Sequence, residues 1–450
     1  MNTQPKPSPH SSVNANVKAN THATAQTLAQ AQALDANDAL RSQRDLFELP
    51  EGVIYLDGNS LGARPKSALQ AAQHLLVEQW GKGLIGSWNG GADYESWFTL
   101  PLRLGDQLAP IVGANPGEVL VCDTTSTNLF KVLACALQMQ SKAAPQRRVV
   151  VSEASNFPTD LYMMQGINHW LQSVGAAPYE LRLIAHPSEL AGALRSDVAV
   201  LMLTHVNYRT GSMFDMAAIT AQAHAAGALT VWDLAHSAGA VPVDLNAAHA
   251  DFAVGCTYKY LNGGPGAPAF VWAQAAHVAA ASIHQPLTGW WGHSAPFAMS
   301  HDYAPKAGIE QFNCGTQPVL SMALVACGLA ITRQVPMAAL RSKSLALTEF
   351  FIAQAETRCA GLGIALISPR DAAQRGSQAS FTHENAYAVM QALIERGVVG
   401  DFRAPDILRF GFAPLYIGFE DAFNSVEILH DILQSGVWKD AKYQTRRTVT

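Results

Sequence analysis

The sequence predicts an α/β protein with a mostly parallel central sheet in a large domain, followed by a smaller α+β domain. Short runs of apolar, largely β-branched residues alternate with amphipathic helical stretches between residues 149 and 254. Runs this apolar are typical of strands in a parallel sheet that helices cover on both faces. From about Pro318 the alternation gives way to long helical stretches and a few short strands. We therefore expect a large domain, with an N-terminal arm, over residues 41–317 and a small C-terminal domain over residues 318–450.

The elements follow in order along the chain. Residues 1–40 lack aromatic residues and carry few charges, so we expect a disordered tail, although a helical pattern begins near Leu28. The predicted strands of the large sheet are residues 149–151, 198–203, 229–232 and 252–254, with helices over 159–174 and 219–226 between them. Further short strands are expected at residues 53–56, 381–382, 398–400 and 408–412. In such a sheet, ligands bind beyond the carboxyl ends of the strands.

The composition excludes several classes of protein. The 450 residues include 30 Lys+Arg and 35 Asp+Glu, a formal charge of −5, which argues against a nucleic-acid-binding protein. No run approaches the roughly 18 apolar residues of a membrane span. The six cysteines are scattered, with no CxxC pair, which favours reduced thiols in a cytoplasmic protein over a disulfide framework or a zinc site.

Lys259 is the first candidate catalytic residue. It follows a short apolar strand and precedes a loop rich in glycine and proline, Gly263–Gly266, which lacks the GxGxxG dinucleotide fingerprint. Most lysines at turns are simply solvated. Here the buried strand, with Tyr258, Tyr260 and Cys256 nearby, predicts partial desolvation, which favours the neutral amine that a Schiff base requires.

An acid and a histidine follow the neighbouring predicted strand. Asp233 stands at the end of residues 229–232, and His236 comes shortly after it. Asp233 could cap the following helix, as aspartate often does. Because strand ends meet at one edge of a parallel sheet, it could instead lie close to Lys259 and keep a pyridine nitrogen protonated. His236 could pack on a ring, bind phosphate or be a buried structural histidine.

Hydroxyl groups mark a candidate phosphate site. Thr125 and Ser126 lie in a polar turn that leads into a helical stretch, and a helix N-terminus of this kind binds anions. An ordinary Ser/Thr cap would show the same pattern. After the strand at residues 149–151, Phe157 is placed where its ring could stack on a planar cofactor or fill the core.

Together these stretches resemble the fold-type-I pyridoxal-phosphate enzymes, and among them the kynureninase family. The matching segments are Tyr55–Gly62, Asn156–Asp160, Trp232–Gly239, Thr257–Asn262, Gly289–His293 and Arg409–Tyr416. They are spread in one order over about residues 45 to 430, which makes the combination specific although each segment alone is weak. The resemblance implies an aspartate-aminotransferase-like fold, pyridoxal 5'-phosphate as cofactor and a homodimer with shared active sites.

The resemblance also implies a role for individual residues. Lys259 would bind the cofactor covalently, Asp233 would pair with its ring nitrogen, and Tyr258 would contact its phosphate and act as an acid or base. The other implied cofactor neighbours are Thr125, Ser126, Phe157, Pro158, Thr159, Asp160, Thr204 and His236, with Trp290 and Thr316 reaching in from the partner subunit. The implied substrate contacts are Ser60, Trp88 and Arg409, whose guanidinium would hold the substrate carboxylate in bidentate fashion. No metal is implied.

The implied reaction is the hydrolysis of a carbon–carbon bond in a ketonic substrate. L-kynurenine would give anthranilate and L-alanine, and L-3-hydroxykynurenine would give 3-hydroxyanthranilate, in tryptophan degradation and the supply of NAD precursors. Trp88 and Gly315-Thr316 match the bacterial type of the family, where animal enzymes carry His and Ser-Asn. These positions would flank the aryl ring, and a buried hydroxyl without a partner costs roughly 1–3 kcal/mol. We therefore expect a preference for L-kynurenine.

Three other interpretations are weaker. A cysteine desulfurase, or an aminotransferase for small substrates, would share the fold. A desulfurase needs a nucleophilic cysteine on a mobile loop, but Cys359 ends a helical stretch. A cofactor-binding protein without activity is disfavoured because Lys259, Asp233 and Arg409 are all present. A metal-dependent hydrolase is disfavoured because no HxxxH pair lies beside a third ligand in a helical pattern.

Overall fold

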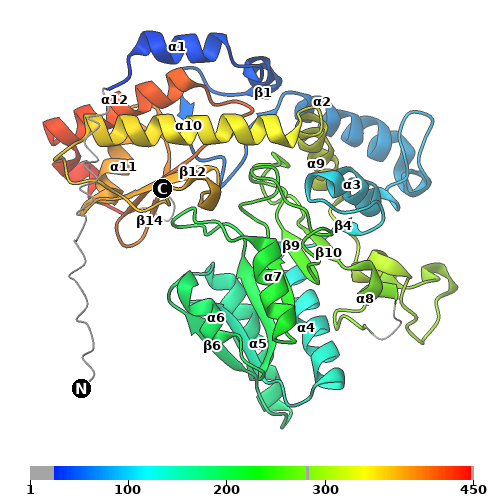
Figure 1. Cartoon of the computed structure of the whole chain (residues 1–450). Coiled ribbons are helices and arrows are strands. Elements are labelled where there is room, and N and C mark those ends of the chain that lie inside the picture. The colour runs from blue at the N-terminus through cyan, green and yellow to red at the C-terminus, as the bar shows by residue number, and fades with distance from the viewer. Residues whose placement is uncertain (1–24, 280–282, 447–450) are drawn as a thin grey trace, which may run out of the picture.

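The computed structural model describes residues 25–279 and 283–446, and its larger sheet lies beneath a smaller one in Figure 1. Within the described residues the larger sheet has seven strands, in the order β4, β10, β9, β8, β7, β5 and β6. These strands are β4 (Val119–Val121), β5 (Val149–Glu153), β6 (Glu180–Ile184), β7 (Val198–Thr204), β8 (Leu229–Asp233), β9 (Phe252–Gly255) and β10 (Phe270–Ala273). Strands β5 to β9 run parallel, and β10 is antiparallel to β9 and β4. The predicted α/β fold with a mostly parallel sheet is confirmed.

The strands are apolar on both faces because helices cover both faces. Val150 and Val231 pack into a core shared with α4 and α5, while their neighbours Val151 and Trp232 belong to the core of the opposite face, which includes α7. The helices are α4 (Thr125–Ala143), α5 (Pro158–Ser173), the short α6 (Leu190–Ala193) and α7 (Met216–Ala225). Successive side chains of a strand point to opposite faces, so burial on both sides selects the continuous apolar runs seen in the sequence.

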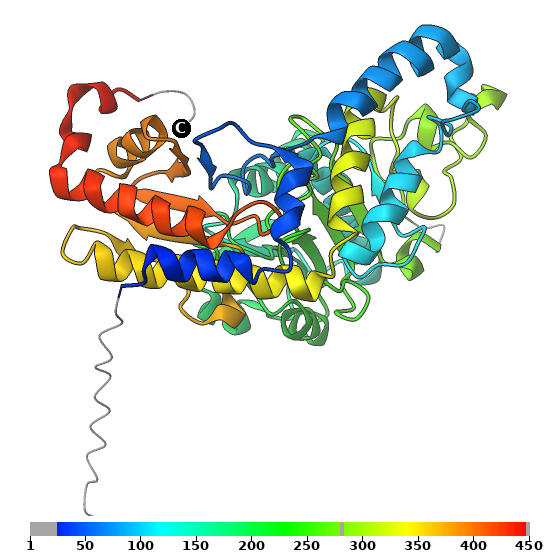
Figure 2. The ribbon, with the colours of Figure 1, turned by 90° about the horizontal axis from the view of Figure 1, so that it is seen from above.

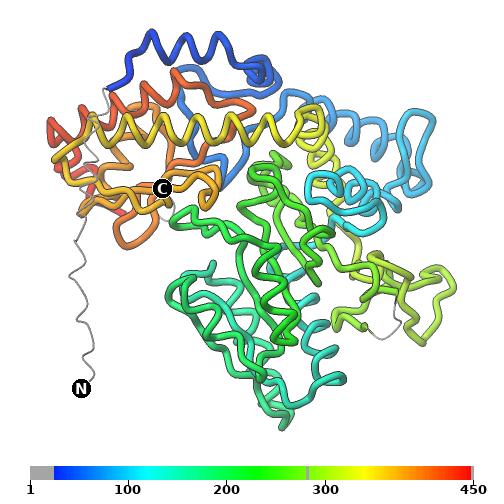
Figure 3. The backbone as a smooth tube through the Cα atoms, viewed as in Figure 1, coloured from blue at the N-terminus to red at the C-terminus, as the bar shows by residue number. Residues whose placement is uncertain are grey.

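The smaller sheet is antiparallel and belongs to the C-terminal part of the chain. Its order is β11 (Ala365–Leu366), β12 (Gln378–Thr382), β15 (Ile407–Gly411) and β14 (Asp401–Arg403). The helices of this part are α9 (Val319–Thr332), α10 (Met337–Arg358), α11 (Ala386–Glu395) and α12 (Phe419–Ser435), coloured yellow to red in Figure 3. In the pairing of β14 with β15, Asp401 lies opposite Arg409, which puts both side chains on one face of the sheet.

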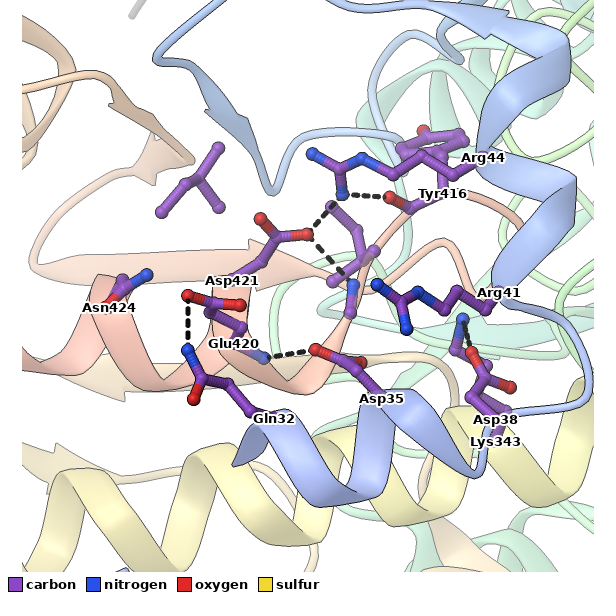
Figure 4. A pocket seen from close by; sticks show the side chains of 13 residues that line it. Gln32, Asp35, Asp38, Arg41, Arg44, Lys343, Tyr416, Glu420, Asp421 and Asn424 are labelled. Carbon is purple, nitrogen blue, oxygen red and sulfur yellow. Dashed lines mark hydrogen bonds and ion pairs between the residues drawn. The ribbon is translucent and has the colours of Figure 1, made fainter. Parts of the chain in front are cut away.

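The N-terminal segment is folded against the C-terminal part. Helix α1 (Leu28–Ala36) lies along α12 in Figure 2 and begins with a capping box between Thr27 and Gln30. At its other end Asp35 accepts hydrogen bonds from the first backbone N–H groups of α12, those of Phe419 and Glu420, at 2.7 and 2.8 Å. Figure 4 shows the contact of Asp35 with Glu420. Residues 28–40 therefore do not belong to the disordered tail predicted over residues 1–40. Residues 1–24 lie outside the described residues.

The remaining short strands connect the N-terminal segment to the rest of the fold. Strand β2 (Ile54–Tyr55) pairs in parallel with β13 (Val398–Val399), and β1 (Phe47–Glu48) pairs with β3 (Arg64–Pro65). Gly62 then approaches the Lys259 loop so closely that a Cβ at this position would lie 2.3 Å from the carbonyl oxygen of Lys259. This close approach brings Ser60 to the carboxyl ends of the large sheet.

A second N-terminal feature projects from the molecule. Helix α2 (Ser67–His74) continues as a π-helix to Gly83, and in Figure 2 it extends beside the loop that follows α8 (Ala275–Ala279). The chain returns through α3 (Leu100–Leu108), which packs on β4 and α9. Among the described residues no single helix is long and apolar enough to cross a membrane; α9 and α10 pass that test only as a pair, and they are bent by 83°.

Candidate active site

A cavity of about 210 Å³ lies between the carboxyl ends of β7 and β8 and the edge of the smaller sheet. Its lining brings together segments from both parts of the chain. The lining residues are Asn59, Ser60, Thr125, Ser126, Phe157, Thr159, Thr204, Tyr208, Asp233, Ala235, His236, Tyr258, Lys259, Arg403 and Arg409. The sequence had singled out most of them, and the expected position beyond the strand ends agrees with this cavity.

Lys259 and His236 are in direct contact. The Lys259 Nζ lies 2.9 Å from Nε2 of the buried His236. Burial, and then the positive charge of Lys259, lower the pKa of His236 well below its ordinary value, so the imidazole is neutral. A neutral imidazole that accepts from Lys259 through Nε2 carries its proton on Nδ1, and this atom is buried without a partner among the described residues.

Two buried aspartates lie beneath the cavity. Asp233 accepts a hydrogen bond from the backbone N–H of Ala235 at 2.8 Å, and burial raises its pKa while Lys259 acts in the opposite direction. Asp160 is fully buried, and burial together with the charge of Asp233 raises its pKa well above the ordinary value. The positive charge of Lys259 lowers the pKa of both carboxyls and so opposes the effect of burial.

Hydroxyl groups from two helix N-termini converge on the opposite wall. Ser126 lies in the first turn of α4 and Thr159 in the first turn of α5, and their hydroxyl oxygens are 2.9 Å apart. Thr124 caps α4 by accepting from the backbone N–H of Thr127 at 3.2 Å. The first N–H groups of a helix have no intrahelical partner, so two such termini with hydroxyl side chains form a site for an anion.

Aromatic rings surround the lysine. The Phe157 ring centroid is 6.0 Å and the Tyr258 ring centroid 5.9 Å from Lys259 Nζ. Tyr208, which the sequence had not singled out, packs edge-on against Phe157 at 5.2 Å. The neighbouring Cys256 and burial raise the pKa of Tyr258 far above its ordinary value, so its phenol stays protonated and acts as a hydrogen-bond donor.

Arg409 is buried, with a side chain 1% exposed, and its guanidinium is already engaged. Its Nε donates to Asp401 Oδ1 at 2.8 Å, and its Nη2 forms a very short contact with the other Asp401 oxygen. Nη2 also donates to Ser60 Oγ at 2.7 Å, and Nη1 donates to the carbonyl oxygen of Tyr208 at 2.7 Å. Asp401 therefore holds the Nε–Nη2 face of the guanidinium in this structure, and the substrate contact implied for Arg409 stays a prediction.

Five of the residues implied by the resemblance do not line the cavity of their own chain: Trp88, Pro158, Asp160, Trp290 and Thr316. Pro158 starts α5, and Asp160 lies behind Thr204, whose Oγ1 is 3.5 Å from Asp160 Oδ2. Thr316 is exposed, and Trp290 is 40% exposed. Trp88 packs edge-on against Trp291 at 5.3 Å, in an aromatic cluster on the projecting side of the molecule.

Several lining residues were missed from the sequence: Asn59, Tyr208, Ala235 and Arg403, together with Asp401 behind the cavity. Asp401 and Arg403 are two residues apart in one short strand, so both side chains lie on the same face. This spacing of an acid and a base, shortly before Arg409, was the only sequence signal for a site at Asp401 and Arg403. The register of β14 with β15, which places Asp401 opposite Arg409, was needed to interpret it.

The cysteine that a desulfurase would need is not available. Cys359 follows the last residue of α10, is 1% exposed, and lies outside the cavity. Burial raises the pKa of its thiol to about 12, which suppresses the thiolate that acts as a nucleophile.

Comparison with known proteins connects this site to a family. A sequence profile described as "Kynureninase C-terminal domain" matches residues 340–429. The chain is 57% identical over 424 residues to a kynureninase from Burkholderia pseudomallei (strain 1106a), covering 94% of this chain and 100% of that protein. It is 56% identical over 418 residues to a kynureninase from Pseudomonas fluorescens, covering 93% and 98%.

Solved structures of lower sequence identity share the fold. A cysteine desulfurase from Thermococcus onnurineus NA1 matches with a TM-score of 0.70 and 17% identity, covering 88% of this chain and 98% of that one. A variant of the cystine C–S lyase C-DES, with glycine covalently linked to its pyridoxal-phosphate cofactor, gives 0.71 and 18%, covering 86% and 98%. The fold-type-I architecture and the resemblance drawn from the sequence motifs are confirmed. This chain belongs to the kynureninase family of pyridoxal-phosphate-dependent hydrolases.

Proposed function

We propose that the cavity at Lys259 is the active site in which this kynureninase hydrolyses L-kynurenine to anthranilate and L-alanine. One observation carries the assignment. The cavity combines an amine in contact with a neutral imidazole, a buried acid and a hydroxyl-lined anion site at two helix N-termini.

The chemistry of the donor set fits pyridoxal 5'-phosphate. The hydroxyl groups of Thr125, Ser126 and Thr159 would hold the phosphate, with the phenol of Tyr258 as a further donor. Phe157 would cover one face of the ring. The carboxylate of Asp233 has one hydrogen bond from the described residues and would hold a proton on the ring nitrogen. When bound, the cofactor supplies an electron sink for the bonds at the substrate Cα.

Lys259 performs the proton transfer at the substrate Cα in this proposal. Its Nζ would hold the cofactor, and as a free amine it would take the proton from the substrate Cα. His236 holds Nζ in place from 2.9 Å without competing for the proton, because burial lowers the pKa of its imidazole and makes it a weak base. Tyr258 keeps its proton and can deliver it to Cβ of the alanine unit when the Cβ–Cγ bond breaks.

Water completes the reaction. It adds to the γ-carbonyl of the substrate, the Cβ–Cγ bond breaks and the aryl fragment leaves as anthranilate. Cβ is then protonated, and the proton that Lys259 took is returned to Cα, which gives L-alanine. We also propose a preference for L-kynurenine over its 3-hydroxy derivative, which rests on Trp88 and Gly315-Thr316. An apolar ring at Trp88 would give a 3-hydroxyl group no hydrogen-bond partner.

We propose that a homodimer completes each site. Trp290 and Thr316 do not line the cavity of their own chain and are exposed enough to reach a second copy. Phe297 and Met299, which follow Trp290 on the same loop, are 71% and 76% exposed, as expected of a surface that a partner covers. We place the enzyme in the cytoplasm, because all six cysteines are unpaired.

Shared sites can be tested by mixing inactive variants. Lys259→Ala and Trp290→Ala homodimers are each expected to have little activity. A hybrid of the two carries one site with both native residues, so mixed and re-equilibrated protein should regain up to about a quarter of wild-type activity. Mixtures that stay as inactive as the separate variants would contradict the shared site.

The activity itself is tested with wild type, Lys259→Ala and a control, Lys82→Ala, whose exposed side chain pairs with Glu78. Each protein is loaded with pyridoxal phosphate, its visible spectrum is recorded, and anthranilate and alanine are assayed after addition of L-kynurenine. Wild type and Lys82→Ala should bind the cofactor and release both products, while Lys259→Ala should release neither. Wild type that binds the cofactor and leaves L-kynurenine intact would overturn the proposed function.

A further inference from the structure

Lys131 is a fully buried lysine that the proposed reaction does not use. It lies in α4 with a side chain 0% exposed, and it does not line the cavity. Its ammonium forms a very short ion pair with Asp123 Oδ2 and donates to the carbonyl oxygen of Phe312 at 2.6 Å and to Asn128 Oδ1 at 3.3 Å. Burial acts against the charge of Lys131, but the neighbouring Cys122 and Asp123 outweigh burial and raise the pKa. A buried ammonium is costly unless its three donors are satisfied, so these contacts fix the position of the groups that accept them.

The shortest contacts of Lys131 join two segments that are far apart in the sequence. Asp123 directly precedes the hydroxyl-rich turn of the anion site, and Phe312 begins a segment that ends at Gln317. The backbone N–H of Asp123 donates to Gln317 Oε1 at 2.9 Å, and Gln317 Nε2 donates to Asp123 Oδ1 at 3.4 Å. The segment 312–317 is therefore anchored at both ends, and the exposed Thr316 lies between the two anchors.

The segment 312–317 also supports the loop that carries Trp290. The backbone N–H of Trp291 donates to the carbonyl oxygen of Cys314 at 3.2 Å. Gly289 lies so close that a Cβ at this position would be 2.2 Å from the same oxygen. Trp290 stands between these two contacts and is 40% exposed. Both side chains that are proposed to enter the partner's cavity are thus held by one unit, which the buried ammonium anchors to α4.

We infer that Lys131 is a positioning residue that acts on the partner's active site, because it holds Trp290 and Thr316 where they enter the cavity of the second copy. The inference rests on the proposed function and on its shared-site homodimer. Lys131 does not line the cavity of its own chain, and its effect passes through its two anchors to the segment 312–317. Replacement of Lys131 should therefore impair the site of the partner more than the site of its own chain.

The experiment uses hybrid dimers in which Lys259→Ala inactivates one chain, so that all activity comes from one site. The two chains carry different affinity tags, and each hybrid is isolated by two successive affinity steps and loaded with pyridoxal phosphate. In the trans hybrid, Lys131→Met is placed on the inactivated chain, which donates Trp290 and Thr316 to the active site of the other chain. In the cis hybrid, Lys131→Met is placed on the chain that keeps Lys259. The reference hybrid carries Lys259→Ala alone.

The cis and trans hybrids contain the same substitutions and differ only in their arrangement. A loss of stability caused by Lys131→Met is therefore common to both, and thermal unfolding verifies this equality. In the trans hybrid, kcat/KM for L-kynurenine should fall about tenfold to 100-fold below the reference, because a small displacement of positioning groups has an effect of this size. The cis hybrid should stay within about twofold, because the hydroxyl groups and helix N-termini of its own anion site are unchanged. Lys142→Met, at the exposed end of α4, is the matched control and should leave both arrangements at the reference value.

Equal losses in the cis and trans hybrids, or no loss in the trans hybrid, would overturn the inference. Gln317→Leu covers the case in which Lys131→Met does not fold, because it removes the other anchor of the segment without leaving a buried charge. It should impair the trans arrangement alone, by about threefold to tenfold, because one neutral hydrogen bond is lost. Wild type that cleaves L-kynurenine as a monomer would overturn the inference and leave the proposed function standing. Failure of the proposed function would be seen separately, as wild type that does not cleave L-kynurenine.

Discussion

Two buried aspartates at opposite ends of the large sheet show how differently the same side chain can be used. Asp233 ends β8 at the cavity, whereas Asp251 stands before β9 at the other edge. Asp251 accepts hydrogen bonds from His224 and His277 at 2.8 Å each, and from the backbone N–H and hydroxyl of Thr230 at 2.8 and 3.0 Å. Among the described residues, Asp233 receives one hydrogen bond, from the backbone N–H of Ala235.

The pKa values follow from these surroundings. Burial alone would raise the pKa of Asp251, but its hydrogen-bond donors outweigh burial and lower the pKa to about 2. At Asp233 burial prevails and the pKa is raised. A buried carboxylate whose donors all come from the protein needs no ligand and stabilises the fold, whereas one left short of donors is prepared for a ligand that supplies them.

The largest effect should come from Asp233→Asn. The amide cannot hold a proton on the cofactor ring nitrogen, so kcat for L-kynurenine should fall by a factor on the order of 10²–10⁴. Stability should not fall, because Asn removes a buried charge and can still accept from Ala235. Steady-state assays and thermal unfolding measure both quantities. Asp215→Asn, at the N-cap of α7, is the control, since Asn caps as well as Asp. A drop in stability without a drop in kcat would show that Asp233 stabilises the fold and does not serve the cofactor.

Asp251→Asn should show the complementary result. The amide NH2 would stand where a carboxylate oxygen now accepts a hydrogen bond, so two donors would face each other. We therefore expect a loss of about 3 kcal/mol in the free energy of unfolding. Denaturant titration measures this loss. The activity of each folded, cofactor-loaded site should remain near that of wild type. A stable Asp251→Asn protein would show that the His224 and His277 contacts contribute little.

The pH dependence of stability should have opposite slopes at the two ends. The lowered pKa of Asp251 adds stability above its unfolded value near 3.9, and this stability is lost as pH falls toward about 2. Asp57, beside the cavity, has a pKa raised to about 7, so its contribution falls as pH rises from about 4 to 7. Asp57→Asn should therefore gain stability relative to wild type between about pH 5 and pH 8 in denaturant titrations. A gain that is constant across this range would show that Asp57 ionises normally.

The smallest effect is expected from Ser126→Ala. Losing one hydroxyl of the anion site should raise Kd for pyridoxal phosphate about fivefold to tenfold, because one hydrogen bond contributes about 1 kcal/mol. Ser141→Ala, near the far end of the same helix and exposed, is the matched control. Spectral titration of the apoenzyme measures both. Equal affinities in the two variants would place the phosphate elsewhere.

Residues that directly follow strands could be placed from the sequence. Asp233 and Lys259 come after apolar runs, and parallel strands bring their carboxyl ends to one edge, so their proximity follows from topology alone. Ser126 could also be placed from the sequence, because it lies in the first turn of a predicted helix. The strands β4, β6 and β10 were not predicted. Strands β4 and β10 are short, and in β6 apolar residues alternate with charged ones.

Other features depend on contacts that local sequence does not encode. Asp401 and Arg403 enter the site through the register of β14 with β15, and Ser60 enters through the pairing of β2 with β13. The hydrogen bond between Asp251 and His277 joins the residue before β9 to helix α8, which follows β10. Helix α1 was partly assigned to a tail because its stability comes from caps and from α12, not from its own composition.

The most direct test of the contrast is the stabilisation that pyridoxal phosphate gives to the apoenzyme. Ligand binding stabilises the folded state by RT ln(1 + [L]/Kd), so the shift in unfolding temperature measures the affinity for the cofactor. A carboxylate that pairs with the cofactor should change this shift when it is replaced. Thermal unfolding of wild type, Asp233→Asn and Asp251→Asn is measured with and without saturating cofactor. The account predicts that wild type and Asp251→Asn gain equally and that Asp233→Asn gains clearly less. An equal gain in Asp233→Asn and wild type would contradict the claim that Asp233 is the carboxylate prepared for the ligand.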